Sequence, residues 1–419
     1  MLHARFLRVL VTSLLAALPV RAAADSFKVT DFGAVADGRT LNTSAIQKAI
    51  EAAAGKGGVV VIPAGTFLSG SIFLRPGVEL RLDRDAVLLG SNRIEDYPKR
   101  ETRIEGHFEA WRMALVNAQA MDKVRIHGEG KIDGNGAVFW EAFWQRRKEN
   151  PKCTNLEVER PRLMFIDRCK DVRIEGLRFR DSGFWNLHVY RCRGVVIEGL
   201  DIHAPTIGKL RGPSTDGMDI DSSQDVTIRK CKISVNDDNI ALKGSKGPLA
   251  DKDADSPPVE NILVEDCEIG DGNGLITCGS EATIVRDVTV RNCRITGNAT
   301  ALTLKLRPDT PQHYERILIE NIQLSGSGRL LNVAPWKQFF DLKGHAPPSR
   351  KVNDITLRNI TGKFGSLGTL RGNPGDTLEN ITLENIDLKL STDGFLPGKV
   401  RNLVMKNVRV NGREQGADR

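Results

Sequence analysis

The sequence predicts an all-β protein, a single-stranded parallel β-helix whose N-terminal end is capped by a helix. Two observations predict the solenoid. The first is a short sequence pattern, with the period-two alternation of a strand, that recurs along most of the chain. The second is its spacing, since the closest copies, such as those at 172 and 195, lie 22 or 23 residues apart. Strands that recur at such a period describe a solenoid in which like positions stack. A third observation, a helical pattern ahead of the repeats, predicts the cap.

The recurring pattern reads apolar-x-apolar, then two mostly polar residues, then apolar-x-apolar. Within each half the apolar residues alternate with period two, which is typical of a strand with one buried face. The central polar pair shifts the phase, so each copy is predicted to be two short strands joined by a bend. Copies begin at Val172, Val195, Val226, Ile262, Val288, Ile317, Ile355, Ile381 and Leu403.

Leucine-rich repeats share a period of twenty-odd residues and are the nearest alternative architecture. Their Leu-x-x-Leu-x-Leu spacing and their helical segment are absent from this chain. The β-helix is therefore the better fit, and the wider gaps between copies are predicted to be loops or insertions.

A solenoid exposes sheet edges and core at its ends, so caps are expected. Residues 42–54 supply one, because small polar residues that favour helix starts precede an apolar face, and glycines follow it. At the other end, the polar residues 411–419 are predicted to be a frayed tail. The apolar face of the cap consists of Ile46, Ala49, Ile50 and Ala53.

The N-terminus has the pattern of a secretory signal peptide. Two arginines precede the apolar run 9–18, which is too short to span a bilayer, and the alanines 22–24 offer a cleavage site. We therefore predict a signal peptide over 1–24 and one catalytic β-helix domain over 25–410. The alternative is an uncleaved anchor. A secreted or periplasmic location follows from the prediction.

The charge balance is compatible with an acidic substrate. Removal of 1–24 takes away three arginines and no acids, so the net charge falls from +7 to +4. A mildly basic protein suits a polyanion. No basic block dominates any segment, and an exported protein is not expected to meet nucleic acid. We expect a monomer that binds no membrane after cleavage of the signal.

The seven cysteines are predicted to be packed thiols, with disulfides as the alternative. Three of them share one slot of the repeat with isoleucines, and a position common to Cys and Ile indicates a small buried apolar group. A second pair, Cys169 and Cys192, lies 23 residues apart. The shared slot holds Cys231, Cys267, Cys293, Ile322, Ile360 and Ile386.

Three aspartates are the candidate catalytic residues. Asp216 and Asp237 are 21 residues apart, close to one coil, and both lie just before predicted strands. Like positions on successive coils are roughly 4.8 Å apart, so Asp216, Asp237 and Asp238 should cluster. Clustered carboxylates repel, and at least one should keep its proton near neutrality. An acid beside a base suits glycoside hydrolysis, whereas a solvated patch or a calcium site are the alternatives.

Several stretches resemble glycoside hydrolase family 28, the polygalacturonase family, over nearly the whole mature length. Residues 29–38, 130–136 and 185–188 show the resemblance. More specific are Thr215–Ile220, similar to the family's Asn-Thr-Asp motif, and Asp237–Lys243, similar to its Asp-Asp motif. The resemblance implies a right-handed β-helix that cleaves α-linked galacturonic acid in pectin-type polysaccharides.

The same resemblance implies roles for the aspartates. Asp237 would be the general acid that protonates the glycosidic oxygen, and Asp216 and Asp238 would activate a water on the opposite side, which gives inversion. Carboxylates roughly 6.5–9.5 Å apart are then expected. The family uses no metal and no cofactor, so none is implied here.

The substrate-holding motifs depart from the family pattern. Its Gly-His-Gly motif aligns with a segment that carries Asn273 in place of the histidine. Its Arg-Ile-Lys motif keeps Lys305 but loses the arginine, which with the lysine would hold the uronate carboxylate. Ser214 replaces the asparagine of Asn-Thr-Asp. We hypothesise that Arg307 supplies the missing charge, unless Pro308 ends the strand and turns it away.

Aromatic and loop residues favour an exo-acting enzyme. Residues 307–314 and 336–343 contain groups that would wall off one end of a groove, and Trp336 suits stacking on a sugar, with core packing as the alternative. Of Trp185 and His188, one is expected to line the site and the other to pack inward. A β-helix polysaccharide lyase with calcium and a non-catalytic carbohydrate-binding solenoid remain competing functions, with an epimerase less supported.

Overall fold

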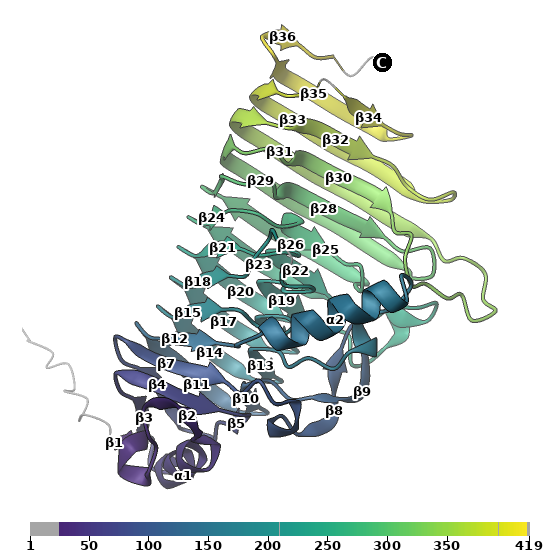
Figure 1. Ribbon diagram of the computed structural model, residues 1–419. Helices are drawn as coiled ribbons and strands as arrows, with labels where there is room; N and C mark the ends of the chain where they lie inside the picture. The colour runs from purple at the N-terminus through teal and green to yellow at the C-terminus, as the bar shows by residue number, and fades with distance from the viewer. Residues whose placement is uncertain (1–24, 209, 393, 417–419) are drawn as a thin grey trace, which may run out of the picture.

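The chain winds into a stack of β-strand coils (Figure 1). The computed structural model describes residues 25–208, 210–392 and 394–416. The predicted signal peptide, 1–24, lies outside the described residues. Strands of each coil pair in parallel with strands of the next, and the predicted right-handed parallel β-helix is the fold observed.

The larger sheet, of 23 strands, holds two columns of stacked strands that follow the two halves of the repeat. In the first column Val172 pairs with Val195, and Val195 with Val226, so like positions stack as predicted. This column contains β1 (Ser26–Lys28), β3 (Val59–Ile62), β6 (Glu79–Leu82), β11 (Asp122–Gly128), β14 (Lys170–Glu175), β17 (Arg193–Glu198), β20 (Gln224–Arg229), β23 (Val259–Glu265) and β26 (Ile284–Arg291).

The second column runs beside the first, and in the last coils the two merge into long strands. Its strands are β2 (Asp37–Leu41), β4 (Gly65–Ser69), β7 (Ala86–Gly90), β12 (Lys131–Asp133), β15 (Arg178–Arg180), β18 (Asp201–His203), β21 (Lys232–Ser234), β24 (Glu268–Ile269) and β27 (Arg294–Ile295). The merged strands are β29 (Gln312–Ser325), β31 (Arg350–Phe364), β33 (Thr377–Leu390) and β35 (Arg401–Val410).

The bend between the halves of each repeat is made by residues in the left-handed region. Asn321, Asn359 and Asn385 have φ values of 56°, 56° and 53°. Asparagine tolerates this conformation better than most residues. Their side chains also form a ladder, in which Asn359 donates to Asn321 at 3.1 Å and Asn385 donates to Asn359 at 3.2 Å.

The 11-stranded sheet forms the third column, and the functional site lies against it. All of its strand pairs are parallel, with one strand contributed by each coil. Its strands are β5 (Ile72–Phe73), β10 (Val116–Gln119), β13 (Met164–Asp167), β16 (Leu187–Tyr190), β19 (Met218–Asp221), β22 (Ile240–Lys243), β25 (Gly274–Cys278), β28 (Thr300–Leu306), β30 (Arg329–Pro335), β32 (Ser366–Leu370) and β34 (Phe395–Pro397).

The interior between the columns is one continuous apolar core. The cysteine slot of the repeat lies within it, and Ile322 pairs with Ile360, and Ile360 with Ile386, in the later coils. All seven cysteines are buried and free, which confirms the prediction of packed thiols. Burial of these apolar ladders is the main favourable term for the fold.

Both ends of the stack are covered. The helix α1 (Thr43–Ala53) begins and ends within one residue of the predicted cap and buries all four residues of the predicted apolar face. At the other end, β36 (Arg413–Glu414) turns back and pairs antiparallel with β35. The described part of the predicted tail, up to 416, is therefore not frayed, because Gln415 donates its backbone N–H to Val408.

The insertions project from the coils and hold the remaining elements. An antiparallel hairpin of β8 (Lys99–Ile104) and β9 (His107–Arg112) and the helix α2 (Ala137–Glu149) lie on one side of the stack (Figure 1). Neither helix of the described chain is long and apolar enough to cross a membrane. Short 3₁₀ helices are η1 (Val29–Phe32), η2 (Ile94–Asp96), η3 (Asn155–Glu157) and η4 (Ala250–Lys252).

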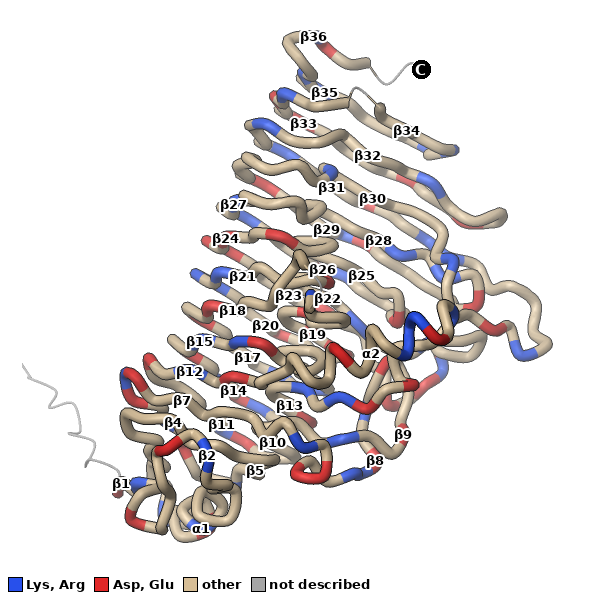
Figure 2. The backbone as a smooth tube through the Cα atoms, in the orientation of Figure 1, with Lys and Arg blue, Asp and Glu red and all other residues tan. Residues whose placement is uncertain are grey.

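Basic and acidic residues are both distributed over the whole stack of coils (Figure 2). Many pair across adjacent coils, and Arg291, for example, donates two hydrogen bonds to Glu265 on the preceding coil. Exposed pairs of this kind each contribute little to stability. The outer face is therefore solvated and locally neutral, in contrast to the site described next.

Candidate active site

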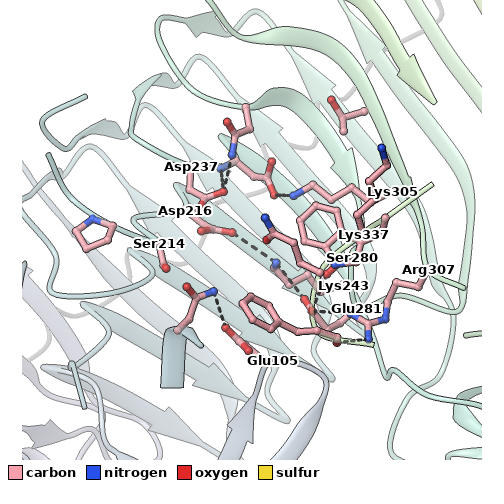
Figure 3. Close-up of a pocket in the computed structure, with 18 of the residues that line it drawn as sticks. Glu105, Ser214, Asp216, Asp237, Lys243, Ser280, Glu281, Lys305, Arg307 and Lys337 are labelled. Carbon is pink, nitrogen blue, oxygen red and sulfur yellow. Dashed lines mark hydrogen bonds and ion pairs between the residues drawn. The ribbon is translucent and has the colours of Figure 1, made fainter. Parts of the chain in front are cut away.

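Three aspartates meet at the turns that lead into the 11-stranded sheet. Asp216 precedes β19, Asp237 and Asp238 precede β22, and the two strands pair with Met218 beside Ile240. One oxygen from each of the three carboxylates lies within 4.8 Å of the others. The clustering predicted from the spacing is therefore confirmed (Figure 3).

The cluster is sheltered from solvent. Asp216 is 3 % exposed and Asp238 is 1 % exposed, whereas Asp237 is half-buried. A solvated acidic patch, one of the alternatives open from the sequence, does not describe this arrangement. Ionising buried carboxylates is costly unless partners are supplied, so the neighbouring groups decide the charge state.

Neighbouring side chains hold two of the carboxylates in place. The amide of Asn273 donates to Asp237 Oδ1 at 2.8 Å. The hydroxyl of Thr277 donates to Asp238 Oδ1 at 2.8 Å, and the ammonium of Lys305 donates to Asp238 Oδ2 at 2.6 Å. Lys305 and Asn273, both predicted substrate contacts, therefore also contact the aspartates directly.

Lys243 is the central cation of the site. Its Nζ lies 3.5 Å from Asp216 Oδ2 and 3.7 Å from Glu281 Oε2 (Figure 3). It also lies 3.5 Å from Asp219 Oδ1 and 4.9 Å from the centre of the Trp185 ring. One buried ammonium thus faces three carboxylates, which leaves negative charge in excess around it.

The pKa values follow from this excess. Burial, and next the negative charges of Asp219 and Asp237, raise the pKa of Asp216 well above its usual range. Burial raises the pKa of Asp219 to about 8, although Lys243 opposes the rise. Burial and the adjacent Asp238 raise the pKa of Asp237. Burial and mutual repulsion thus raise the pKa values of Asp216 and Asp237, the direction expected for clustered carboxyl groups.

The aspartates have the donor chemistry of a calcium site, because oxygen ligands suit hard cations. Ammonium groups already occupy the neighbouring positions, however, with Lys305 hydrogen-bonded to Asp238 and Lys243 close to Asp216. A divalent ion against these oxygens would be repelled by both lysines. The residues present do not fit a resident cation.

The aspartates line a cavity with a volume of about 710 Å³. Its walls come from insertions on different coils: α2, the tip of the β8–β9 hairpin at Glu105, and the segment 336–339 that follows β30. Glu105 accepts a hydrogen bond from Asn155 at 3.0 Å and lies 3.9 Å from Lys246. The α2 contributions are Phe143, Trp144 and Arg147.

Besides Trp144 of α2, two further tryptophans line the cavity, and the histidine next to Trp185 does not. Trp185 and Trp336 both contribute to the lining. His188 is fully buried, with Nδ1 at 2.7 Å from Arg162 and Nε2 at 3.3 Å from Asp221. Burial lowers its pKa to about 4. The expectation that one residue of the Trp185–His188 pair faces the site and the other packs inward is confirmed.

Arg307 lines the cavity wall, but its guanidinium is engaged. The residue directly follows the end of β28. This is the alternative in which the strand ends before Pro308. Its fork donates two hydrogen bonds to Asp309, each 2.9 Å long, and a third to the carbonyl of Phe339 at 2.8 Å. It also lies 3.7 Å from Glu281. Arg307 therefore does not offer the free fork that the sequence suggested.

Several site residues escaped the sequence analysis. Lys243 and Asp219 occupy outward positions of strands β22 and β19, and the period-two pattern would have assigned them to the face that carries the aspartates. Glu281 follows β25, and Glu105 comes from a hairpin outside the repeat. No periodic signal connects these two glutamates to the site.

The nearest carboxylate oxygens of the three aspartates lie closer together than the separation expected between whole carboxyl groups. An inverting site was expected to separate its carboxylates by roughly 6.5–9.5 Å. Oxygens of Asp216, Asp237 and Asp238 instead approach within 4.8 Å. The three residues lie on two adjacent coils, so their backbones are about one strand spacing apart. Carboxylates on opposite walls of a cleft are not held together in this way.

Comparison with known proteins identifies the family of this chain. The model of the glycosyl hydrolases family 28 matches residues 59–411. A probable polygalacturonase of Vitis vinifera is 33 % identical over 88 % of this chain and 75 % of its own length. An endo-polygalacturonase of Pectobacterium carotovorum subsp. carotovorum is 28 % identical over 87 % of each chain.

A solved structure shows the same fold. The exopolygalacturonase from Thermotoga maritima superimposes with a TM-score of 0.77 at 23 % identity, over 95 % of this chain and 93 % of that one. The family match covers the coils that carry the aspartates as well as the cavity walls. The chain belongs to glycosyl hydrolases family 28 and is a glycoside hydrolase.

Proposed function

We propose that this enzyme cleaves α-linked galacturonic acid in pectin-type polysaccharides or oligosaccharides. The observation that carries the proposal is the cluster of three sheltered aspartates, with raised pKa values for two of them, beside two lysines in one cavity. Acid and base are both available there, and the lysines suit an acidic substrate. The names of the relatives, which are polygalacturonases, support the choice of sugar.

Asp237 is the proposed general acid. It is the most exposed of the three aspartates and faces the cavity, and burial and the adjacent Asp238 raise its pKa, which favours the role of acid. Asn273 donates to one of its oxygens at 2.8 Å, which fixes the orientation of the carboxyl group. The proton on the other oxygen is then directed to a glycosidic oxygen bound in the cavity.

Asp216 and Asp238 are the proposed bases that position and deprotonate a water. Asp238 accepts hydrogen bonds from Thr277 and Lys305, and Lys243 stabilises the ionised form of Asp216. A water held between them attacks the anomeric carbon on the face opposite to Asp237, with inversion. Inversion is proposed from the resemblance to the family.

Lys305, Asn273 and Arg307 are the proposed substrate-binding residues, in different ways. Lys305 lies at the cavity surface 5.2 Å from the centre of the Trp336 ring and bears a positive charge toward the sugar. Asn273 borders the acid. Arg307 acts by holding Asp309 and the segment at Phe339, and so maintains the wall.

Exo action is the proposed mode of cleavage. Insertions wall the cavity from several coils, with α2 and the β8–β9 hairpin contributing from earlier coils and 336–339 from a later one. Walls that interrupt a groove block a continuing polymer and favour chain ends. Both exo- and endo-polygalacturonase names occur among the relatives, so the argument rests on the walls. The predicted signal peptide supports a proposed site of action outside the cytoplasm.

The test is incubation of wild type and Asp237→Asn with oligogalacturonides. Wild type should release galacturonic acid without a new ultraviolet absorbance, because hydrolysis adds water and creates no double bond. Asp237→Asn should lose at least about a hundredfold in kcat, since general acid catalysis contributes 10²–10⁴-fold. It should still bind the oligomer by calorimetry.

The other outcomes identify the competing functions. An unsaturated, ultraviolet-absorbing product that needs calcium would show a lyase. Binding without turnover in wild type would show a carbohydrate-binding solenoid. Full activity of Asp237→Asn would remove Asp237 from the role of acid.

A further inference from the structure

Most basic side chains of the cavity are committed to partners inside the protein. Lys243 faces three carboxylates, Lys305 is hydrogen-bonded to Asp238, and Lys246 lies 3.9 Å from Glu105. Arg307 is held by Asp309. Arg147 lies over the Phe143 ring, with its carbon Cζ 5.3 Å from the ring centre, and donates to a backbone carbonyl. Each of these groups therefore shares its charge or its hydrogen bonds with a partner in the protein, and none presents an unpaired charge to a ligand.

Two basic side chains of the cavity are uncommitted. Arg329 and Lys337 both line it and are exposed, and neither side chain enters an ion pair or a hydrogen bond with another described residue. Lys337 lies on the segment after β30, whereas Arg329 is the first residue of that strand. Of these two unpaired cations, Arg329 is therefore the one whose backbone is held in the sheet.

The sheet register locates Arg329 relative to the aspartates. In the β28–β30 pair Leu302 lies beside Leu331, so the same register sets Thr300 beside Arg329. In the β25–β28 pair Gly274 lies beside Thr300. Arg329 therefore stands at the same edge of the sheet as Gly274, two strand spacings or about 10 Å away.

That edge continues to the acid. Asn273, the residue before Gly274, donates to Asp237 at 2.8 Å. The backbone of Arg329 therefore lies about 10 Å from the strand that begins beside Asn273, the hydrogen-bond partner of Asp237. An extended arginine side chain and one bound sugar residue together span that distance. The same cavity is lined by Thr303, whose buried hydroxyl has no hydrogen-bond partner among the described residues.

We propose that Arg329 is the specificity-determining residue that binds the carboxylate of a uronic acid residue of the substrate. The inference rests on the proposed function and deepens it, because it adds to Lys305 an unpaired cation that selects acidic sugars in the same cavity. A guanidinium presents a fork that matches a carboxylate, and an arginine without a protein partner keeps that fork available. Lys337 offers only a point charge.

The test compares free-acid oligogalacturonides with their methyl esters, because esterification removes the charge that Arg329 binds and leaves the sugar unchanged. Arg329→Gln should raise KM for the free acid at least about tenfold, the change expected for loss of a charged hydrogen bond. It should leave KM for the ester unchanged, so the preference for acid over ester falls. Arg329→Lys should restore part of the preference.

Arg371→Gln is the matched control. Arg371 is also exposed, directly follows β32 on the next coil, and lies outside the cavity lining. Lys337→Gln tests the other free cation. Both should keep the wild-type preference for acid over ester, and thermal melting should show that all the variants fold.

Other results would overturn the proposal in distinct ways. Unchanged KM and preference in Arg329→Gln, with wild type active on galacturonides, would remove Arg329 from recognition while the proposed function stands. A loss shared equally by acid and ester would assign Arg329 a structural role. If wild type neither binds nor cleaves galacturonides, the proposed function fails and this inference falls with it.

Discussion

At the scale of single residues, the site is governed by the ratio of carboxylates to ammonium groups. Around Lys243 lie Asp216, Asp219 and Glu281, all almost fully buried. Burial opposes the charge of Lys243, but the surrounding carboxylates outweigh burial and raise its pKa well above the usual value. Lys243 therefore stays charged and lowers the cost of ionising Asp216 beside the acid.

Replacement of Lys243 by glutamine should move the acidic limb of the pH profile. Loss of the ammonium raises the already raised pKa of Asp216 further, so the ionised base disappears at a higher pH. The acidic limb of kcat/KM should shift upward by about one to three pH units, the usual effect of an adjacent opposite charge. Lys246→Gln, which removes a cation of the same cavity, should leave that limb in place. An unshifted limb in Lys243→Gln would contradict the role given to Lys243.

At this scale the sequence predicted the clustering of the aspartates well, but it predicted the substrate-binding residues poorly. The spacing of Asp216 and Asp237 sufficed because stacking converts one coil of sequence into one strand spacing. Arg307 could not be placed in the same way, since its contacts with Asp309 and Phe339 depend on loop conformations. Glu105 reaches the cavity from a hairpin more than a hundred residues before the aspartates, and no local pattern indicates that.

At the scale of elements, the bends between strands restrict the choice of residue as much as the strands do. The phase shift in the repeat predicted a bend, and the structure shows a residue in the left-handed region there; in the later coils it is an asparagine whose side chain also bonds to the adjacent coil. Both properties select asparagine over most other residues. The bend column is thus a second stack that fixes the register of the coils, next to the apolar ladders.

Two substitutions at Asn359 separate these properties. Asn359→Ala loses the side-chain ladder and keeps a Cβ in the left-handed region, so it should lower the free energy of unfolding by about 1–2 kcal/mol or more. Asn359→Gly loses the ladder alone and should cost less. Urea denaturation of both variants measures the difference, and an equal effect would show that the conformation contributes nothing.

Shortening the wall after β30 should change the product pattern. Replacement of 338–345 by a brief glycine-serine turn removes the part of the wall held by Arg307 and Asp309 through Phe339 and Asp341. The cavity should then admit internal segments of a polymer. Chromatography of early products should change from galacturonic acid alone to mixed oligomers, whereas an unchanged release of monomer would show that another element sets the exo mode.

At the scale of the whole molecule, the repeat explains both the fold and the position of the site. Regular coils supply a rigid array of turns at one edge of the 11-stranded sheet, and insertions such as α2 enclose the part of that edge where the aspartates stack. The array was predictable because period, alternation and slot sharing all pointed to one architecture. The enclosure was not, since insertions have no counterpart in the repeat.

The most direct test of the central claim is the anomeric configuration of the first product. Proton NMR should follow the wild-type enzyme on an oligogalacturonide during the first turnovers, before mutarotation mixes the anomers. Inverting hydrolysis by Asp216, Asp237 and Asp238 predicts that the new reducing end appears first as the β-anomer. The α-anomer as first product would show retention, in keeping with the short carboxylate spacing, and would contradict the water-attack mechanism proposed for these aspartates.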